Sequence, residues 1–174
     1  NYKEIKFKLI NSEKLPFNSN KFDIVTILDV LEHVDNDKEM ISEIYRVLKK
    51  EGLLILSVPN KGLLTFLDAD NIKITMPLLY KLFYFFVNRS LPKIKNEIHK
   101  HYNIEELNEL INDMFKIEKI HIGASIISTI ISYFEILTYR LFNKRYFNSF
   151  FNVIKNFDYN INYGRFGDNI IIKA

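Results

Sequence analysis

The clearest hydrophobic pattern in the chain runs from Phe22 to Pro59. The segment FDIVTIL at residues 22–28 is rich in β-branched and aromatic side chains, and it predicts a short strand buried on both faces. Residues 37–50 follow with apolar side chains at helical spacing, and residues 53–58 (LLILSV) are again almost wholly apolar. A helix between two buried strands predicts a βαβ unit with a parallel sheet and a right-handed crossover.

Polar residues mark both ends of the predicted helix. Residues 35–37 (DND) offer N-caps and place negative charge at the positive end of the helix dipole. Lys49 and Lys50 are expected in the last turn, where they complement the dipole, and Gly52 is expected to end the helix.

Further elements follow from the same patterns. Asn103 and Glu106 form a capping box ahead of a helix with an apolar face. An aromatic, apolar helix is predicted at 76–87, but it is too short to span a bilayer. Three more strands are predicted at 5–10, 115–122 and 169–174.

Composition narrows the class of protein. A length of 174 residues fits one domain, and the hydrophobic fraction of 48% is ordinary for a globular chain. A net charge of +3 is too small to indicate a nucleic-acid partner. The chain has no cysteine, which excludes disulfides and thiolate metal sites and is compatible with a cytoplasmic location.

Several motifs together resemble one known family. The segments LPF, FDIV, DVLEHV, EIYRVLKKEG and LLILSVPN occur in this order between residues 15 and 60. They resemble the second half of class I S-adenosylmethionine-dependent methyltransferases of the type 11 and quinone-methyltransferase kind. HKHYNIEEL near residue 100 and the ending GDNIIIKA resemble the family more loosely. The turn LKKEG departs from the family's usual LKPGG, which leaves the turn feasible but looser.

The resemblance implies an α/β fold with a Rossmann-like sheet. The family's strand order is 3-2-1-4-5-7-6, and this chain would supply strands 3 to 7 with helical insertions. The five glycines stand at 52, 62, 123, 164 and 167, and none forms the G-x-G turn after an early strand that holds the cofactor in this fold. We therefore expect a single partial methyltransferase domain over 1–174, a fragment whose strand at 22–28 is an exposed edge and whose N-terminus is poorly anchored.

The resemblance also implies where S-adenosylmethionine binds. Asn11 and Ser12 open the segment NSEKLPF, which is similar to the family's adenine-binding loop, although a polar turn is the alternative. Leu28 and Asp29 are implied near the methionine part of the cofactor, where a carboxylate suits a sulfonium cation. His33 is implied beside them as a cofactor contact or a general base, because an imidazole commonly titrates near neutral pH. The alternative is that Glu32 and His33 are solvated loop residues.

A metal site is a further alternative at the same place. Asp29, Glu32 and His33 resemble the E-x-x-E-H ligand set of magnesium-dependent relatives. Because Asp replaces the first Glu and L-E-H is common in the family without a metal, we predict no metal site.

The resemblance places His101 and Tyr102 at the rim of the active site, as candidates for substrate contact or proton transfer. His99 and His101 form a weak metal pair as the alternative. Residues 62–102 are implied to be a lid that selects the substrate, with Phe83, Tyr84 and Phe86 over a pocket. A helix packed on the sheet is the other interpretation.

Residues 124–163 form an unusual insertion between the last two predicted strands. Apolar residues recur at helical spacing and are followed by the basic residues Arg140, Lys144 and Arg145. This pattern is typical of an interfacial helix on anionic lipid, and hence of peripheral membrane contact. A helical cap that buries its stripe on the domain is the alternative.

The function implied by the family is direct methyl transfer from S-adenosylmethionine to an unidentified small-molecule acceptor. The aromatic content of the two insertions favours a lipid-linked or aromatic acceptor. Catalysis would depend mainly on positioning and desolvation. We expect the chain to be inactive alone. The competing hypothesis is a cofactor-free, degenerate module that acts as a membrane- or protein-interaction domain.

Overall fold

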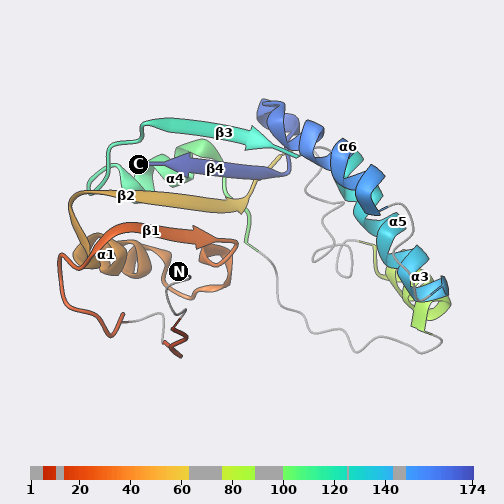
Figure 1. Cartoon of the computed structure of the whole chain (residues 1–174), viewed down its shortest axis with the longest axis horizontal. Helices are drawn as coiled ribbons and strands as arrows, with labels where there is room; N and C mark the ends of the chain where they lie inside the picture. The colour runs from red at the N-terminus through yellow and green to blue at the C-terminus, as the bar shows by residue number, and fades with distance from the viewer. Residues whose placement is uncertain (1–5, 11–13, 63–75, 89–99, 125, 143–147) are drawn as a thin grey trace.

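The computed structural model describes residues 6–10, 14–62, 76–88, 100–124, 126–142 and 148–174. Within these ranges one four-stranded sheet has the order β1-β2-β4-β3 (Figure 1). β1 and β2 are parallel, and β4 is antiparallel to both β2 and β3. The strands are β1 (Phe22–Leu28), β2 (Leu48–Pro59), β3 (Lys119–Gly123) and β4 (Asn169–Lys173). This order reproduces the 4-5-7-6 part of the expected arrangement, so the predicted topology is confirmed for these strands.

The predicted βαβ unit is confirmed, but its helix is shorter than expected. Helix α1 (Asp37–Val47) begins at Asn36, whose side chain accepts a hydrogen bond from the Glu39 backbone N–H at 3.1 Å. The helix ends before Leu48 because that residue is extended, buried and paired with Phe22 of β1. Lys49 and Lys50 therefore belong to β2 and not to the last helical turn, which corrects the sequence prediction.

Gly52 has a different role from the predicted helix stop. The pairing of β1 with β2 moves from Phe22↔Leu48 to Ile24↔Leu53, so residues 49–52 form an irregular excursion. Glu51 has the left-handed backbone there, with φ +62°. A Cβ on Gly52 would lie 2.9 Å from the Lys49 carbonyl oxygen, so glycine is needed for this close approach.

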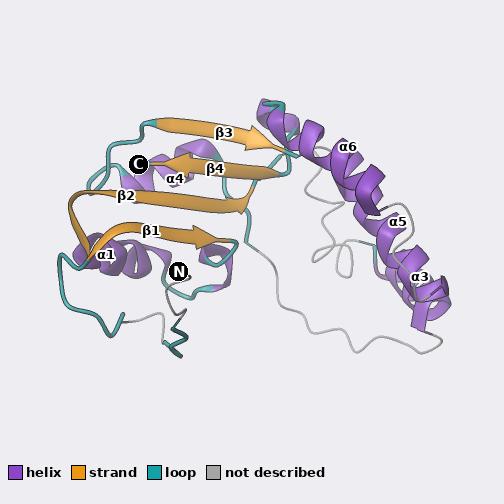
Figure 2. Ribbon diagram, viewed as in Figure 1, coloured by secondary structure: helices purple, strands orange, loops and turns teal. Residues whose placement is uncertain are grey.

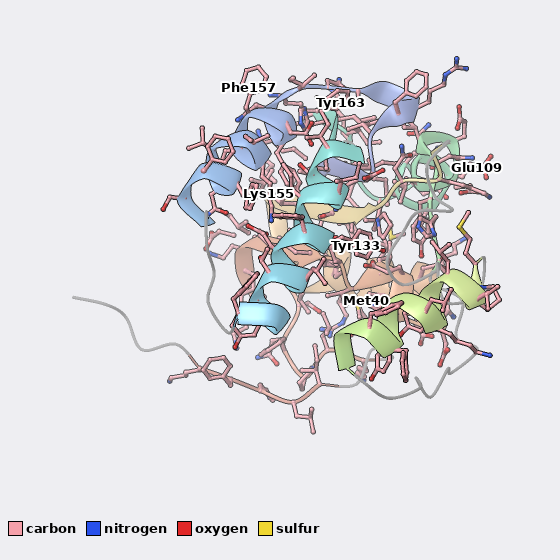
Figure 3. All side chains as sticks on the ribbon, turned by 90° about the vertical axis from the view of Figure 1, so that its right-hand side faces the viewer. Met40, Glu109, Tyr133, Lys155, Phe157 and Tyr163 are labelled. Atoms are coloured by element: carbon pink, nitrogen blue, oxygen red, sulfur yellow. The ribbon has the colours of Figure 1, made fainter. Side chains whose placement is uncertain are left out.

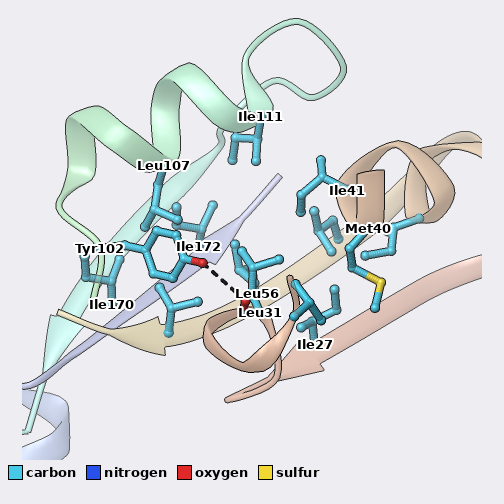
Figure 4. Close-up of a cluster of buried hydrophobic side chains, with 14 of the residues drawn as sticks. Ile27, Leu31, Met40, Ile41, Leu56, Tyr102, Leu107, Ile111, Ile170 and Ile172 are labelled. Carbon is cyan, nitrogen blue, oxygen red and sulfur yellow. Dashed lines mark hydrogen bonds between the residues drawn. The ribbon is translucent and has the colours of Figure 1, made fainter. Parts of the chain in front are cut away.

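The buried core lies on one face of the sheet. α1, the 3-10 turn η1 (Leu31–His33) and α4 (Ile104–Ile111) supply side chains to this face (Figures 2 and 4). The capping box of α4 is confirmed, with Asn103 and Glu106 bonded in both directions. The largest fully buried side chains include Leu31, Ile41, Ile44, Leu54, Leu56, Leu107, Ile111, Ile170 and Ile172.

β1 is not buried on both faces as its apolar sequence predicted. Ile24 and Leu28 are both more than half exposed, whereas Ile27 points into the core and is buried. β1 lies at the edge of the sheet, and the helices that cover the core lie on one side only. The expectation that residues 22–28 form an exposed edge strand is therefore confirmed.

Two predicted strands differ from the structure. Residues 6–10 have no strand conformation, and Phe7 and Leu9 are almost fully exposed, so the part of the predicted 5–10 strand that is described does not form. β3 begins at Lys119 and not at 115, because the Phe115 N–H still bonds to the Ile111 carbonyl of α4 at 2.8 Å.

Three helices lie apart from the core, beyond the end of the sheet at which β1 and β2 finish (Figure 1). They are α3 (Pro77–Asn88), α5 (Ile126–Phe142) and α6 (Asn148–Asn160). We call them the helical arm. α3 contacts α5 and not the sheet, which contradicts the interpretation that it packs on the sheet. Among the described helices, none is both long and apolar enough to cross a membrane.

Candidate functional site

The candidate site is built around Asp29, the first residue after β1. Its backbone has φ +51°, a left-handed conformation that is uncommon for residues other than glycine. Its N–H donates to the Ser57 carbonyl of β2 at 3.1 Å, which extends the parallel ladder by one residue. The turn therefore leaves the sheet at a fixed angle and holds the Asp29 side chain at the carboxyl ends of β1 and β2.

Two neighbouring strands hold the Asp29 carboxylate. Ser57 Oγ donates to Asp29 Oδ1 at 2.9 Å, and Asn169 Nδ2 donates to the same oxygen at 3.3 Å. Ser57 is buried, and its Oγ lies 3.0 Å from Asn169 Oδ1. β4 is antiparallel, so its first residue meets the end of β2 and completes this cluster. We call Asp29, Ser57 and Asn169 the carboxylate cluster.

The carboxylate cluster has the position and charge of a ligand site. In open α/β sheets, ligands bind outside the carboxyl ends of the parallel strands. Asp29 is exposed there, and the adjoining Leu28 offers an apolar surface that is 59% exposed. An ionised carboxylate fixed by two donors suits a cationic group such as a sulfonium. Leu28 and Asp29 thus lie together, as expected for a contact with the methionine part of the cofactor.

η1 places Glu32 and His33 on opposite sides of the next turn. The Glu32 side chain is fully buried, while that of His33 is 61% exposed. His33 Nε2 lies 4.0 Å from Glu32 Oε1. The interpretation of Glu32 as a solvated loop residue is therefore wrong, because the core side of η1 encloses it, whereas His33 is accessible to a ligand.

Tyr102 lies in the core rather than at an open rim. It is buried, and its hydroxyl group donates to the Leu31 carbonyl at 3.2 Å (Figure 4). The Asp37 Oδ2 atom lies 3.1 Å from the same hydroxyl oxygen and shares this donor. Burial raises the pKa of the Tyr102 hydroxyl well above its usual range, and the negative charge of Asp37 adds to this effect. The predicted rim position of Tyr102 is corrected by this burial, which makes the residue a poor proton donor or acceptor near neutral pH.

The segment around Tyr102 ties the loops of the candidate site together. Tyr102 exchanges backbone hydrogen bonds with Pro59 (3.0 Å) and Lys61 (2.8 Å) at the end of β2. Lys100 Nζ donates to the Val34 carbonyl after η1 at 2.8 Å. His101 lies between these anchors and is half-buried. His101 therefore lies beside the end of β2. Its role in substrate contact stays a prediction.

The remaining predicted cofactor contacts, Asn11 and Ser12, lie outside the described residues. The LPF part of the same loop is described, and Arg46 of α1 holds it. The Arg46 guanidinium donates to the Leu15 carbonyl at 2.9 Å and to the Phe17 carbonyl at 2.8 Å. The loop implied to contact the adenine is thus fixed to the βαβ unit.

Two further observations concern ligands. In the described part of the chain, no group of three or more His, Asp and Glu side chains is arranged to hold a metal ion. A cavity of about 470 Å³ lies at the other end of the sheet, lined by the start of β2 and by Tyr45, Phe115 and Ala174. Its position, away from the carboxyl ends of β1 and β2, separates it from the carboxylate cluster.

Sequence reasoning missed Ser57 and Asn169. Each is a polar residue in or beside an apolar strand segment, Ser57 within LLILSVPN and Asn169 within GDNIIIKA. A polar residue in an apolar strand segment is a signal that could have indicated a site residue. However, only the antiparallel pairing of β4 with β2 brings the two side chains to Asp29.

Comparisons with known proteins agree with this fold. The family described as "Methyltransferase domain" matches residues 1–56. A ubiquinone/menaquinone biosynthesis C-methyltransferase of Hydrogenovibrio crunogenus is 37% identical over 90 residues, which cover 52% of this chain and 31% of that protein. A mitochondrial ubiquinone biosynthesis O-methyltransferase of Dictyostelium discoideum is 38% identical over 52 residues, covering 30% of this chain and 16% of that protein.

A solved structure supports the fold independently. A candidate sarcosine dimethylglycine methyltransferase from Galdieria sulphuraria superposes with a TM-score of 0.55 at 13% identity, covering 95% of this chain and 57% of that chain. Residues 1–56 therefore match the methyltransferase-domain family, and the superposition supports the same α/β fold for the chain as a whole. The chain spans about a third or less of the curated relatives it matches.

Proposed function

We propose that the chain contributes the sulfonium-facing and acceptor-facing side of a methyltransferase active site, which methylates an aromatic, lipid-linked small molecule. The observation that carries this proposal is the carboxylate cluster at the carboxyl ends of β1 and β2. S-adenosylmethionine, when bound, supplies an electrophilic methyl group on a sulfonium. Asp29, oriented by Ser57 and Asn169, would stabilise that positive charge before transfer.

The residues around the cluster have separate roles in this proposal. His33 is accessible on η1 and would accept the proton that the acceptor loses as its oxygen or carbon is methylated. The backbone held by Arg46 at 15–17 would position the adenine side of the site. Tyr102 acts as a positioning residue, because its hydroxyl holds the backbone of η1 in place.

The acceptor class rests on two lines of support. Both curated relatives described above are named for quinone biosynthesis, one as a C-methyltransferase and one as an O-methyltransferase. In addition, the apolar helical arm lies beyond the same end of the sheet as the carboxylate cluster, where an acceptor would enter (Figure 1). A ring-bearing acceptor with an apolar tail fits both observations.

The test compares this chain with an extended form that carries a glycine-rich first strand ahead of Asn1. Each is incubated with methyl-labelled S-adenosylmethionine and a hydroquinone that carries a prenyl tail, and the labelled product is extracted. We expect methylation by the extended form only, and a lower rate with the same hydroquinone lacking its tail. Absence of transfer by both forms, together with absence of cofactor binding, would reject the enzyme proposal. A preference for small hydrophilic acceptors would reject the acceptor class.

A second function is favoured by the exposed apolar surface of the helical arm. In that case the chain acts as an interaction domain for a membrane or a protein and needs no cofactor. Calorimetric titration with S-adenosylmethionine separates the two functions. A methyltransferase must bind this cofactor and release or absorb heat, whereas an interaction domain need not bind it.

A further inference from the structure

Polar contacts join two helices of the helical arm. Ser128 of α5 and Tyr163 both donate to the Asp158 carboxylate of α6, the latter at 2.7 Å. Lys155 Nζ of α6 lies 2.5 Å from Glu135 Oε2 of α5. Asp158 and Ser128 are almost completely buried. Hydrogen bonds and an ion pair therefore join α5 to α6, in contrast to the apolar core under the sheet.

The apolar side chains of the arm are on its outside. No described residue of α3, α5 or α6 belongs to the buried apolar core. On α6 the exposed residues Phe150, Val153 and Phe157 recur at spacings of three and four, as on one face of a helix. Phe157, the most exposed of them at 70%, projects from α6 at the border of the molecule (Figure 3). The exposed apolar and aromatic residues are Leu78, Leu79, Leu82, Phe85 and Phe86 of α3, Ile127, Ile130, Phe134, Tyr139 and Phe142 of α5, and Phe150, Val153, Phe157 and Tyr159 of α6.

This arrangement is unfavourable in water and favourable in an apolar medium. Soluble proteins rarely expose contiguous apolar patches of this kind unless something binds them. In lipid, helices associate through polar contacts and close packing while apolar side chains face the hydrocarbon. The arm has polar contacts of this kind, with the Lys155–Glu135 pair partly buried between α5 and α6.

The charges of the arm favour an anionic lipid surface. Its acidic residues are Glu135, which pairs with Lys155, and Asp158, which is buried. By sequence, α3 and α5 also carry the cationic residues Lys81 and Arg140, and Lys144 and Arg145 stand between α5 and α6. Two copies of this chain docked through the arm would bring these like charges together, which disfavours a self-association surface.

We propose that the helical arm is a monotopic membrane anchor that lies in the headgroup region of an anionic bilayer. α5 has 17 residues and is about 26 Å long at 1.5 Å per residue, which is less than the roughly 30 Å hydrocarbon core. The arm therefore lies on the surface with its outer stripes inserted and its lysines and arginines at the phosphates. This anchoring needs no cofactor, so a failure of methyl transfer leaves it standing.

The absence of tryptophan in the chain makes a direct test available. Phe157→Trp places a single fluorescent reporter on the outside of α6. Phe7→Trp is the matched control, because Phe7 is also exposed, at 94%, but lies in the N-terminal segment outside the arm. Each full-length variant is mixed with vesicles of phosphatidylcholine alone or with 30% phosphatidylglycerol, and the emission is recorded with and without brominated lipid.

We expect a blue shift and strong quenching by brominated lipid for the Phe157→Trp reporter with anionic vesicles only, and no change for the Phe7→Trp reporter. In a flotation assay, Phe150→Ser combined with Phe157→Ser should lower vesicle binding at least tenfold. Lys81→Glu, a surface change that does not disturb packing, should weaken binding to the anionic vesicles alone. Circular dichroism verifies that the helices persist in every variant.

Three outcomes would overturn the proposal. The first is an unchanged Phe157→Trp spectrum with both kinds of vesicle. The second is equal quenching of the two reporters, which would mean non-specific adsorption. The third is a concentration-dependent dimer by light scattering that the Phe150→Ser and Phe157→Ser changes abolish, without vesicle binding, which would assign the surface to a second copy of the chain.

Discussion

Arg46 donates two hydrogen bonds to the carboxylate of Glu43, from Nε to Oε1 at 2.7 Å and from Nη2 to Oε2 at 2.7 Å. The same carboxylate accepts the Leu15 backbone N–H at 2.8 Å, while Arg46 also donates to the carbonyls of Leu15 and Phe17. The pair thus joins α1 to the loop that leads into β1. The position of this loop, which the family resemblance places against the adenine, therefore depends on the charge of Glu43.

The stability of the fold should therefore fall in acid. The Arg46 guanidinium holds the pKa of Glu43 down to about 2, and the Leu15 N–H adds to this effect. A lowered pKa means that the unfolded chain binds the proton first as pH falls. The stabilisation is present above roughly pH 4.5, the unfolded value, and is lost between there and about pH 2. Urea unfolding at a series of pH values measures this loss.

Glu43→Gln should flatten that acid dependence and destabilise the fold by about 1–2 kcal/mol at neutral pH, because the charge-assisted bonds are lost. Glu118→Gln is the matched control. Both Glu118 and its partner Lys173 lie on the surface, so the loss of this pair should leave the free energy of unfolding nearly unchanged. If both variants behave alike, the Glu43 pair does not hold the loop.

Tyr102→Phe should destabilise the fold by about 1 kcal/mol, because the Leu31 carbonyl and Asp37 lose a buried donor. The parent chain should also lose stability as pH rises above about 10, the ordinary tyrosine value. The pKa of Tyr102 is raised in the fold, so the unfolded state releases the proton first.

Chemical denaturation between pH 8 and 11 checks both statements. Tyr45→Phe serves as the control, since Tyr45 is more than half exposed. Tyr102→Phe should reduce the alkaline decline, whereas Tyr45→Phe should leave it as in the parent. An unchanged decline in Tyr102→Phe would show that the buried hydroxyl does not titrate with unfolding.

Hydrogen exchange should separate the N-terminal segment from β1. Residues 6–10 have no strand pairing and are exposed, so their amides should exchange at close to unfolded rates. Amides of β1 that bond to β2 should be protected by at least a hundredfold more, and mass spectrometry of peptic fragments resolves the two segments. Equal protection of residues 6–10 and 22–28 would contradict the exposed position of the N-terminal segment.

The sequence predicted the local units of this fold well. A β-branched and aromatic run located β1, helical spacing of apolar residues located α1, and Asn103 with Glu106 marked the start of α4. Such signals are local, because a cap or an apolar stripe is written into neighbouring residues. The boundary at Leu48 was missed, since its extended conformation depends on pairing with Phe22, a contact between distant residues.

The candidate site was predictable only in part. Asp29 and His33 follow directly from the end of a strand and lie at the expected edge. The donors Ser57 and Asn169 come from strands far apart in sequence, so only the sheet order reveals them. The position of Tyr102 was predicted wrongly. Its motif resembles one at an active-site rim, but the side chain is buried and holds the backbone of η1. Apolar patterns indicated α3 and α5 but not which of their faces is exposed, and α6 was not predicted as a separate helix.

The most direct measurement is calorimetric titration of S-adenosylmethionine into the extended form and its Asp29→Asn variant, with Asp23→Asn as the control. Asp23 is a carboxylate at the start of β1, at the opposite end of the strand from Asp29, and it pairs with Lys49. The account predicts that Asp29→Asn raises the dissociation constant at least tenfold, or about 1.4 kcal/mol, while Asp23→Asn leaves it unchanged. Equal affinity in all three proteins would contradict the assignment of the cofactor to the carboxylate cluster.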